Sequence, residues 1–186
     1  GAVTAGAVTL KGTGDLTLRN CQNLTASAIS YSGLNGTVTF EYASSQANRT
    51  VESTLISAIK AQTDQKVKYA FSGTTAAKGW NFGSWDKTVI KTHIVIGEGT
   101  HTWSQNNNGV SGGKFGENGT DENPTLLVKS GATLNFTGKD LSGYQNEFVA
   151  GGVIRVNAGG TLNFKQPSGS NPNMNCRQRL GLDPGS

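Results

Sequence analysis

The residues able to do acid–base or metal chemistry are few and scattered. The chain has two histidines and two cysteines among 186 residues. His93 and His101 lie eight positions apart, and neither has a cysteine or carboxylate at metal-ligand spacing. The sequence therefore predicts no catalytic set, no metal site and no cofactor, and it favours His101 as a hydrogen-bonded histidine of the core.

Carboxylates gather in the polar run 117–123, which also carries amide side chains. Carboxylate and amide oxygens are the ligands that calcium takes. The run lacks the alternation and the terminal Glu of an EF-hand loop, so we interpret it as a solvated loop. A calcium site is the alternative.

Aromatic side chains offer another kind of chemistry, the stacking of flat ligands. Trp80, Phe82 and Trp85 lie in the Gly-interrupted segment 79–86. Aromatic residues in loops form platforms for sugar rings or partner proteins. We therefore predict a ligand-binding site at these three residues, with the alternative that the rings fill a gap in the core.

The composition indicates which elements position these residues. Glycine contributes 26 residues and only 15% of residues are charged, which favours strands and turns. The 16 Lys and Arg are scattered, so nucleic-acid binding, which needs a basic cluster, is not expected. No apolar run is long enough to span a bilayer.

An internal repeat organises the chain. The segments 95–103, 128–136 and 156–164 align without gaps, each with an apolar start, a small-residue corner and an aromatic end. Similar large residues recur at intervals of 22 to 33 residues, at Leu18, Phe40, Phe71, Trp103, Phe136 and Phe164.

Intervals of this size match one turn of a parallel β solenoid, whose turns stack about 4.8 Å apart. The sequence thus predicts a mainly β, single domain over 1–186 with a C-terminal tail at 165–186. Trp103, Phe136 and Phe164 are expected in one interior column. The alternative is a β-sandwich with Gly-rich turns.

One segment, about 48–64, predicts an inserted amphipathic helix. Asn48 is the expected N-cap, and Glu52 lies in the expected first turn, where the helix dipole favours a negative charge. The helix either caps the stack or lies on its flank. Its apolar residues recur at helical spacing at Val51, Leu55, Ala58 and Ile59.

The repeat units resemble the passenger regions of bacterial autotransporters and related surface adhesins. The similar stretches are SGATLNF at 130–136, AGGTLNF at 158–164 and GTGDLTLRN at 12–20. This resemblance implies a right-handed parallel β-helix displayed outside the cell, often with an adhesive role.

Cys21 and Cys176 lie near opposite ends of the chain. A stack of about six turns would separate them by about 24 Å, whereas a disulfide needs Cα atoms within about 7 Å. Three arrangements stay open: a bond made by a back-folded tail, a bond between neighbouring subunits, and two free thiols.

We therefore expect a non-enzymatic extracellular protein of a cell surface, either an adhesin or a self-assembling structural subunit. Its partners would be copies of itself, joined end to end, or a glycan or protein of a cell surface. The run 1–10 could add a strand to a neighbour's sheet.

The alternative function is a carbohydrate-active β-helix enzyme, a polysaccharide lyase or glycosidase. Asp121, Glu122, Lys129 and Arg155 would then be the reactive groups, an assignment that rests on fold analogy alone. Ice binding would need a flat, regular Thr array, and the Thr spacing looks too irregular for one.

Overall fold

The structure is a computed structural model, and some of its strands are described by their backbone only. The described residues are 3–9, 13–19, 24–30, 36–61, 67–83, 89–104, 114–115, 124–137, 153–165 and 179–182.

The largest sheet among the described residues has seven strands, and every neighbouring pair in it is parallel. The strands follow one another in chain order across this sheet. They are β2 (Leu16–Arg19), β4 (Val38–Ser44), β6 (Val67–Gly73), β9 (His93–Ile96), β12 (Leu126–Val128), β14 (Val153–Val156) and β16 (Arg179–Leu182).

A second parallel sheet has five strands, again in chain order. These are β5 (Arg49–Thr50), β7 (Trp80–Asn81), β10 (Gly99–Ser104), β13 (Ala132–Thr137) and β15 (Thr161–Lys165). Two parallel pairs complete the described strands: β1 (Val3–Thr9) with β3 (Leu24–Ser30), and β8 (Val89–Ile90) with β11 (Lys114–Phe115).

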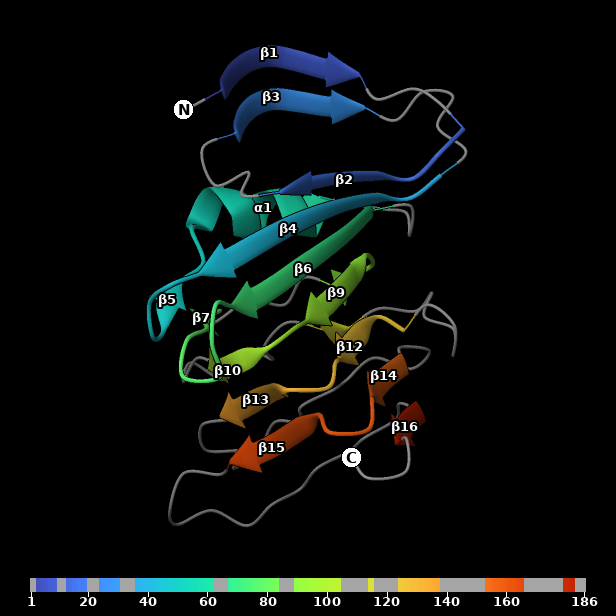
Figure 1. Ribbon diagram of the computed structural model, residues 1–186. Helices are drawn as coiled ribbons and strands as arrows, with labels where there is room; N and C mark the ends of the chain where they lie inside the picture. Colours follow the sequence, from blue (N-terminus) through green and yellow to red (C-terminus); the bar gives the residue numbers. More distant parts are fainter. Residues whose placement is uncertain are drawn as a thin grey trace, which may run out of the picture.

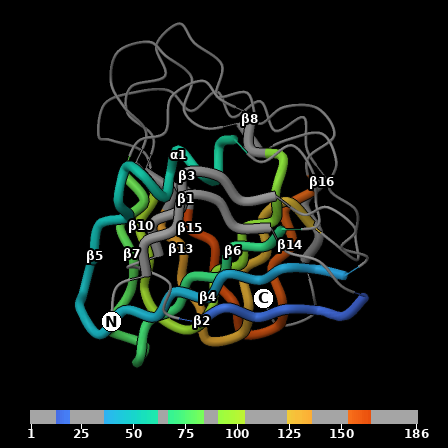
Figure 2. The backbone as a smooth tube through the Cα atoms, turned by 90° about the horizontal axis from the view of Figure 1, so that it is seen from above, coloured from blue at the N-terminus to red at the C-terminus, as the bar shows by residue number. Residues whose placement is uncertain are grey.

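The chain alternates between the two larger sheets. The strands β9, β12 and β14 of the seven-stranded sheet are followed directly by β10, β13 and β15 of the five-stranded sheet. Figure 1 shows these strands stacked as successive layers, and Figure 2 shows β4 and β6 along one side of the stack with β7 and β10 along another. Over the described residues, the prediction of a mainly β chain with parallel sheets and an inserted helix is confirmed. Parallel pairing argues against the β-sandwich alternative, whose sheets are antiparallel.

Successive turns meet at their small-residue corners as well as along their strands. The backbone N–H of Gly99 donates to the carbonyl of Gly131, and the N–H of Gly131 donates to the carbonyl of Gly159. The corners between the two sheets are therefore held in the same stacking direction as the strands.

The repeat register is confirmed in part. Trp103, Phe136 and Phe164 occupy paired positions on β10, β13 and β15, as expected. The gapless alignment is wrong by one residue in the first unit, because Val128 pairs with Ile96 and not with Val95. The corner after β9 is one residue shorter than the corner after β12. The strands on both sides of the corner therefore stay paired, although the alignment changes by one residue between them.

The first members of the recurring aromatic series lie elsewhere. Leu18 pairs with Phe40 on the seven-stranded sheet, and Phe40 pairs with Tyr69. Phe71 pairs with Tyr42 and Ile96, one inward column further along the same strands. The series therefore divides between two sheets and does not form a single column.

Aromatic rings in the core are stacked from strand to strand, because in-register parallel pairing places like residues above one another. The rings of Phe40 and Tyr69 are 5.3 Å apart, and those of Tyr42 and Phe71 are 5.2 Å apart. Further along the stack the inward positions are aliphatic, namely Ile94, Ile96, Leu126, Val128, Ile154 and Val156.

The helix α1 (Ser53–Ala61) is shorter at its start than the sequence predicted. The first helical bond runs from the N–H of Ile56 to the carbonyl of Glu52, so Glu52 takes the N-cap position. Asn48 instead lies in the turn before β5 with a φ of 53°. The predicted apolar stripe is confirmed in part. Ile59 is buried in the core and Leu55 packs against it, whereas Ala58 is exposed and Val51 lies before the helix.

The N-terminal run forms β1, which pairs in register with β3 of the same chain. One edge of β1 is therefore used within the molecule. In the described part of the chain, no helix has the length and apolar character needed to cross a bilayer. The expectation of a single domain over 1–186 stays a prediction.

Candidate functional site

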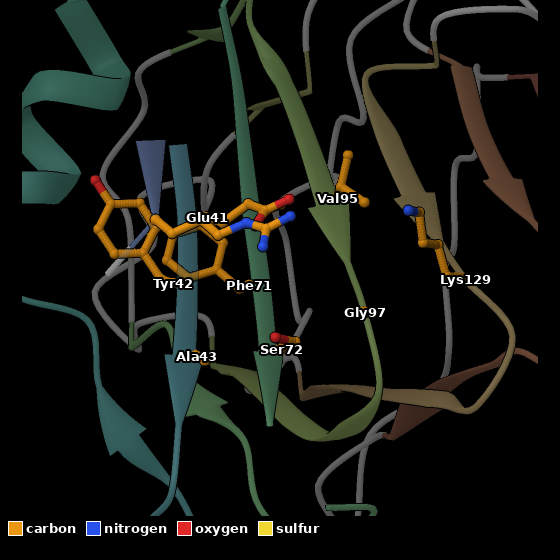
Figure 3. Close-up of a pocket in the computed structure, with 10 residues that line it drawn as sticks. Glu41, Tyr42, Ala43, Phe71, Ser72, Val95, Gly97 and Lys129 are labelled. Atoms are coloured by element: carbon orange, nitrogen blue, oxygen red, sulfur yellow. The ribbon is translucent and has the colours of Figure 1, made fainter. Parts of the chain in front are cut away.

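The seven-stranded sheet carries an open hollow of about 300 Å³ on the face turned away from the core. Figure 3 shows its side chains, with Val95 and Gly97 between Glu41 on one side and Lys129 on the other. The lining residues are Arg19, Glu41, Tyr42, Ala43, Ala70, Phe71, Ser72, Val95, Gly97 and Lys129.

The hollow arises from the alternation of side chains along β4 and β6. Tyr42 and Phe71 are buried because they point into the core, which places their neighbours on the outer face. Apart from Glu41, those outward neighbours are small. Without large side chains the sheet surface stays low, and the low area is formed by Ala43, Ala70, Ser72 and Gly97.

One ion pair borders the hollow. The Nε of Arg19 lies 2.9 Å from Oε2 of Glu41, and the two residues are paired across β2 and β4. Their side chains are 77% and 41% exposed, so solvent limits this pair to about 0–1 kcal/mol of stability. Its structural effect is to hold one positive and one negative group side by side.

The remaining charges on this face are basic, among the side chains that the structure describes in the sheet. Lys129 follows β12 and lines the hollow. Lys68 on β6 and Arg155 on β14 occupy outward positions between buried neighbours. Among the described side chains of the sheet, together with Lys129, basic groups therefore outnumber acidic ones.

Two of the three predicted stacking residues belong to the core. Trp80 is 3% exposed and Phe82 is completely buried. The indole N–H of Trp80 donates to the carbonyl of Ser72 at 2.9 Å, and the ring of Phe82 stacks on Trp103 at 4.7 Å. Neither ring offers a surface to a ligand. Both rings fill the core, which is the alternative that the sequence left open. Trp85 lies outside the described residues.

His101 is a satisfied histidine of the core, as expected. Its Nδ1 accepts a hydrogen bond from the backbone N–H of Trp80 at 3.2 Å, and its Nε2 lies 3.1 Å from the carbonyl of Gly97. Nε2 therefore carries the proton. Burial lowers the pKa of His101, against the opposing effect of the carbonyls of Gly97 and Glu98.

His93 is also buried, with Nδ1 lying 2.8 Å from the carbonyl of Pro124. Burial lowers its pKa most, the bond to Pro124 opposes this, and the charge of Lys68 lowers it further. Both histidines therefore favour the neutral form in the folded protein.

Acidification from about pH 7.5 to about pH 5.5 is expected to lower the free energy of unfolding. Since both folded-state pKa values are lowered, the unfolded chain binds protons near pH 6.5 and the folded chain does not. The loss begins near the unfolded pKa and continues until the folded pKa is reached. It amounts to about 1.4 kcal/mol for each unit of pKa difference.

Urea unfolding at the two pH values measures this loss. The double variant His93→Gln, His101→Gln is the control and should show a flatter pH dependence. An equally steep dependence in the variant would mean that other groups cause the loss.

The five-stranded sheet presents polar columns to the outside. One column places Thr100, Thr133 and Thr161 in register, and this array is more regular than the sequence suggested. In the other, the amide of Asn163 donates to Oδ1 of Asn135 at 3.1 Å. The second column consists of Thr50, Asn81, Thr102, Asn135 and Asn163.

Cys21, Cys176 and the run 117–123, which includes Asp121 and Glu122, lie outside the described residues. Within the described ranges, no group of three His, Cys, Asp or Glu side chains could hold a metal ion. Lys129 and Arg155 lie on the same outer face, in neighbouring columns.

No protein-family model, curated protein or solved structure matches this chain.

Proposed function

We propose that this chain is a non-enzymatic extracellular protein of a cell surface, wound as a right-handed parallel β-helix and binding its partners through its outward faces. Parallel strands joined by a crossover within one sheet are right-handed in about 98% of cases. The sequence resemblance to bacterial surface adhesins supports the location and the adhesive role.

The observation that carries this proposal is the register of outward residues over several turns. The column of Thr100, Thr133 and Thr161 repeats one chemical group along the stack. Repeated hydroxyl and amide groups suit binding to an extended partner better than they suit bond cleavage, which needs an acid and a base in fixed positions.

The hollow supports the same choice over the glycosidase. Glu41 is the carboxylate of its described lining, and it is engaged by Arg19 at 2.9 Å. A retaining or inverting glycosidase needs a pair of carboxyl groups flanking the bond that it cleaves. The lining supplies one carboxylate, together with the ammonium group of Lys129.

Self-assembly is the second candidate. In the described part of the chain, β15 and β16 end their sheets, and each has a neighbouring strand on one side. An open parallel edge is a template for a further strand. Assembly would then extend the stack through a second copy of the chain.

The test compares binding with turnover. The immobilised protein is exposed to a panel of neutral and acidic polysaccharides and to extracellular matrix proteins, and a reducing-end assay with an unsaturated-product assay follows the same polysaccharides. We expect saturable binding without turnover. Release of new ends, abolished by replacing a residue of the hollow, would establish the enzymatic alternative instead.

A further inference from the structure

We propose that the hollow on the seven-stranded sheet is a binding groove for an anionic polysaccharide, a sugar chain that carries sulfate or carboxylate groups. This inference rests on the proposed adhesive role and names the chemical class of the partner. Four features of the hollow carry it: its floor, its charge, its lack of exposed rings and its span.

The floor is low and already hydrogen-bonded. Ala43, Ala70 and Ser72 place no large side chain above the sheet, so a ligand can approach the strands closely. The strands β4, β6 and β9 beneath it each have a parallel neighbour on both sides. A peptide therefore finds no free strand edge there, and β-strand addition, the common way of binding an extended peptide to a sheet, is not available.

The charge favours an anion. The charges of Arg19 and Glu41 offset each other at 2.9 Å. The remaining charged side chain of the described lining is that of Lys129, which is positive. Lys68 adds positive charge to the same outer face. Nearby basic groups raise the local concentration of an anionic ligand, and salt weakens this effect.

The rings beneath the hollow are not exposed. Tyr42 is 5% exposed and Phe71 is completely buried, so neither offers a face on which a neutral sugar could stack. Recognition by ionic and hydrogen-bond contacts, and not by ring stacking, follows from this lining. Sulfate and carboxylate groups are the sugar substituents that make such contacts with lysine and arginine.

The span favours a chain over a single ion. Arg19 on β2 and Lys129 after β12 are separated by four strand spacings, since β4, β6 and β9 lie between β2 and β12. This corresponds to about 19 Å along the stack. A small anion contacts one side of the hollow, whereas an oligosaccharide can lie across the small-residue floor and reach both sides.

The experiment titrates the purified chain with a sulfated hexasaccharide prepared from heparin and with a hexamer of galacturonic acid, using calorimetry. Sodium sulfate, a neutral glucan hexamer and poly-glutamate serve as comparison ligands. We expect at least one anionic hexasaccharide to bind, at least tenfold more tightly than sulfate or the neutral glucan, and binding to weaken as sodium chloride is added.

The variants separate the hollow from general attraction to a basic surface. Lys129→Gln is expected to weaken binding about fivefold, and Glu41→Gln is expected to tighten it about threefold because a repelling carboxylate is removed. Lys60→Gln on α1 makes the same change in net charge as Lys129→Gln outside the hollow, and it should leave the Kd unchanged.

Ala70→Leu is the decisive variant, because it fills the floor without changing any charge. It is expected to weaken binding at least tenfold, while Thr39→Leu on the same face, outside the lining, leaves the Kd unchanged. Thermal unfolding of both variants confirms that they are folded.

Other outcomes overturn the groove. If Ala70→Leu binds like the unchanged protein, the hollow is not the site. Tight binding of sulfate alone would make it a small-anion site, and equal binding of poly-glutamate would make it a general polyanion surface. Binding of only neutral ligands, or of matrix proteins elsewhere, refutes this inference and leaves the adhesive role in place.

Discussion

Replacing Phe71 by alanine is expected to lower the free energy of unfolding by about 3–5 kcal/mol. The side chain is completely buried, and its ring joins the two sheets. It stacks on Tyr42 within the seven-stranded sheet at 5.2 Å and meets Trp80 and Phe82 edge-on at 5.6 and 4.9 Å. Truncation leaves a cavity where these rings meet, and three fixed rings cannot readily close it.

Urea unfolding followed by tryptophan fluorescence measures this loss. Thr39→Ala provides the control, since Thr39 lies on the outer face of the adjacent strand β4, and it should change stability by about 0.5 kcal/mol or less. A loss below about 1 kcal/mol for Phe71→Ala would mean that this ring junction does not hold the sheets together.

Replacing Gly99 by alanine is expected to cost about 3 kcal/mol or more, from backbone strain and from overpacking together. Gly99 has a φ of +122°, a conformation that residues with a side chain rarely adopt. An added Cβ would also overlap the carbonyl oxygen of Lys78 and lie 3.0 Å from the backbone nitrogen of Gly73. Both neighbours belong to the preceding turn, so relief would require two turns to move apart.

Substitutions at two other glycines distinguish the cost of backbone strain from the cost of steric overlap. Gly83 has a φ of +62° but open space around an added Cβ, and Gly83→Ala should cost about 1–2 kcal/mol. Gly14 also has open space and no positive φ, so Gly14→Ala should be close to neutral. Thermal unfolding ranks the three, and a Gly99→Ala loss no larger than that of Gly83→Ala would refute the close contact between turns.

The repeat was the part of the fold that the sequence revealed best. Segments 128–136 and 156–164 pair in the expected register, because identical spacing of corner and strand leaves one alignment that keeps every apolar residue inside. The first unit departs by one residue, since its corner between Ile96 and Gly99 is shorter. Sequence similarity alone does not reveal a deletion that falls among small residues.

The aromatic segment was misjudged at Trp80 and Phe82 because glycines on both sides suggested a loop. The two residues after Gly79 form the short strand β7, and pairing with β5 and β10 turns alternate side chains inward. Such a two-residue strand leaves almost no alternating pattern to read. The helix was placed more accurately, because its stripe of Leu55 and Ile59 has helical spacing.

The hollow could not be predicted from the sequence, because its lining comes from strands far apart along the chain. Ala70 and Val95 are neighbours on the outer face only after β6 and β9 are paired. Small outward residues carry little signal in one strand. The alternation of β4 and β6 would have revealed the low surface once the register between turns was known.

The hydrogen bonds between corners, from Gly99 to Gly131 and from Gly131 to Gly159, run in the same direction as those between strands. Tension applied along the stack therefore pulls on both sets at once, and the piece that detaches is a whole turn. From Tyr69 to Ile94, or from Ile94 to Leu126, each turn released would lengthen the chain by about 80–110 Å. Under tension along the stack, we therefore expect the chain to lengthen in discrete steps of one turn each and not gradually.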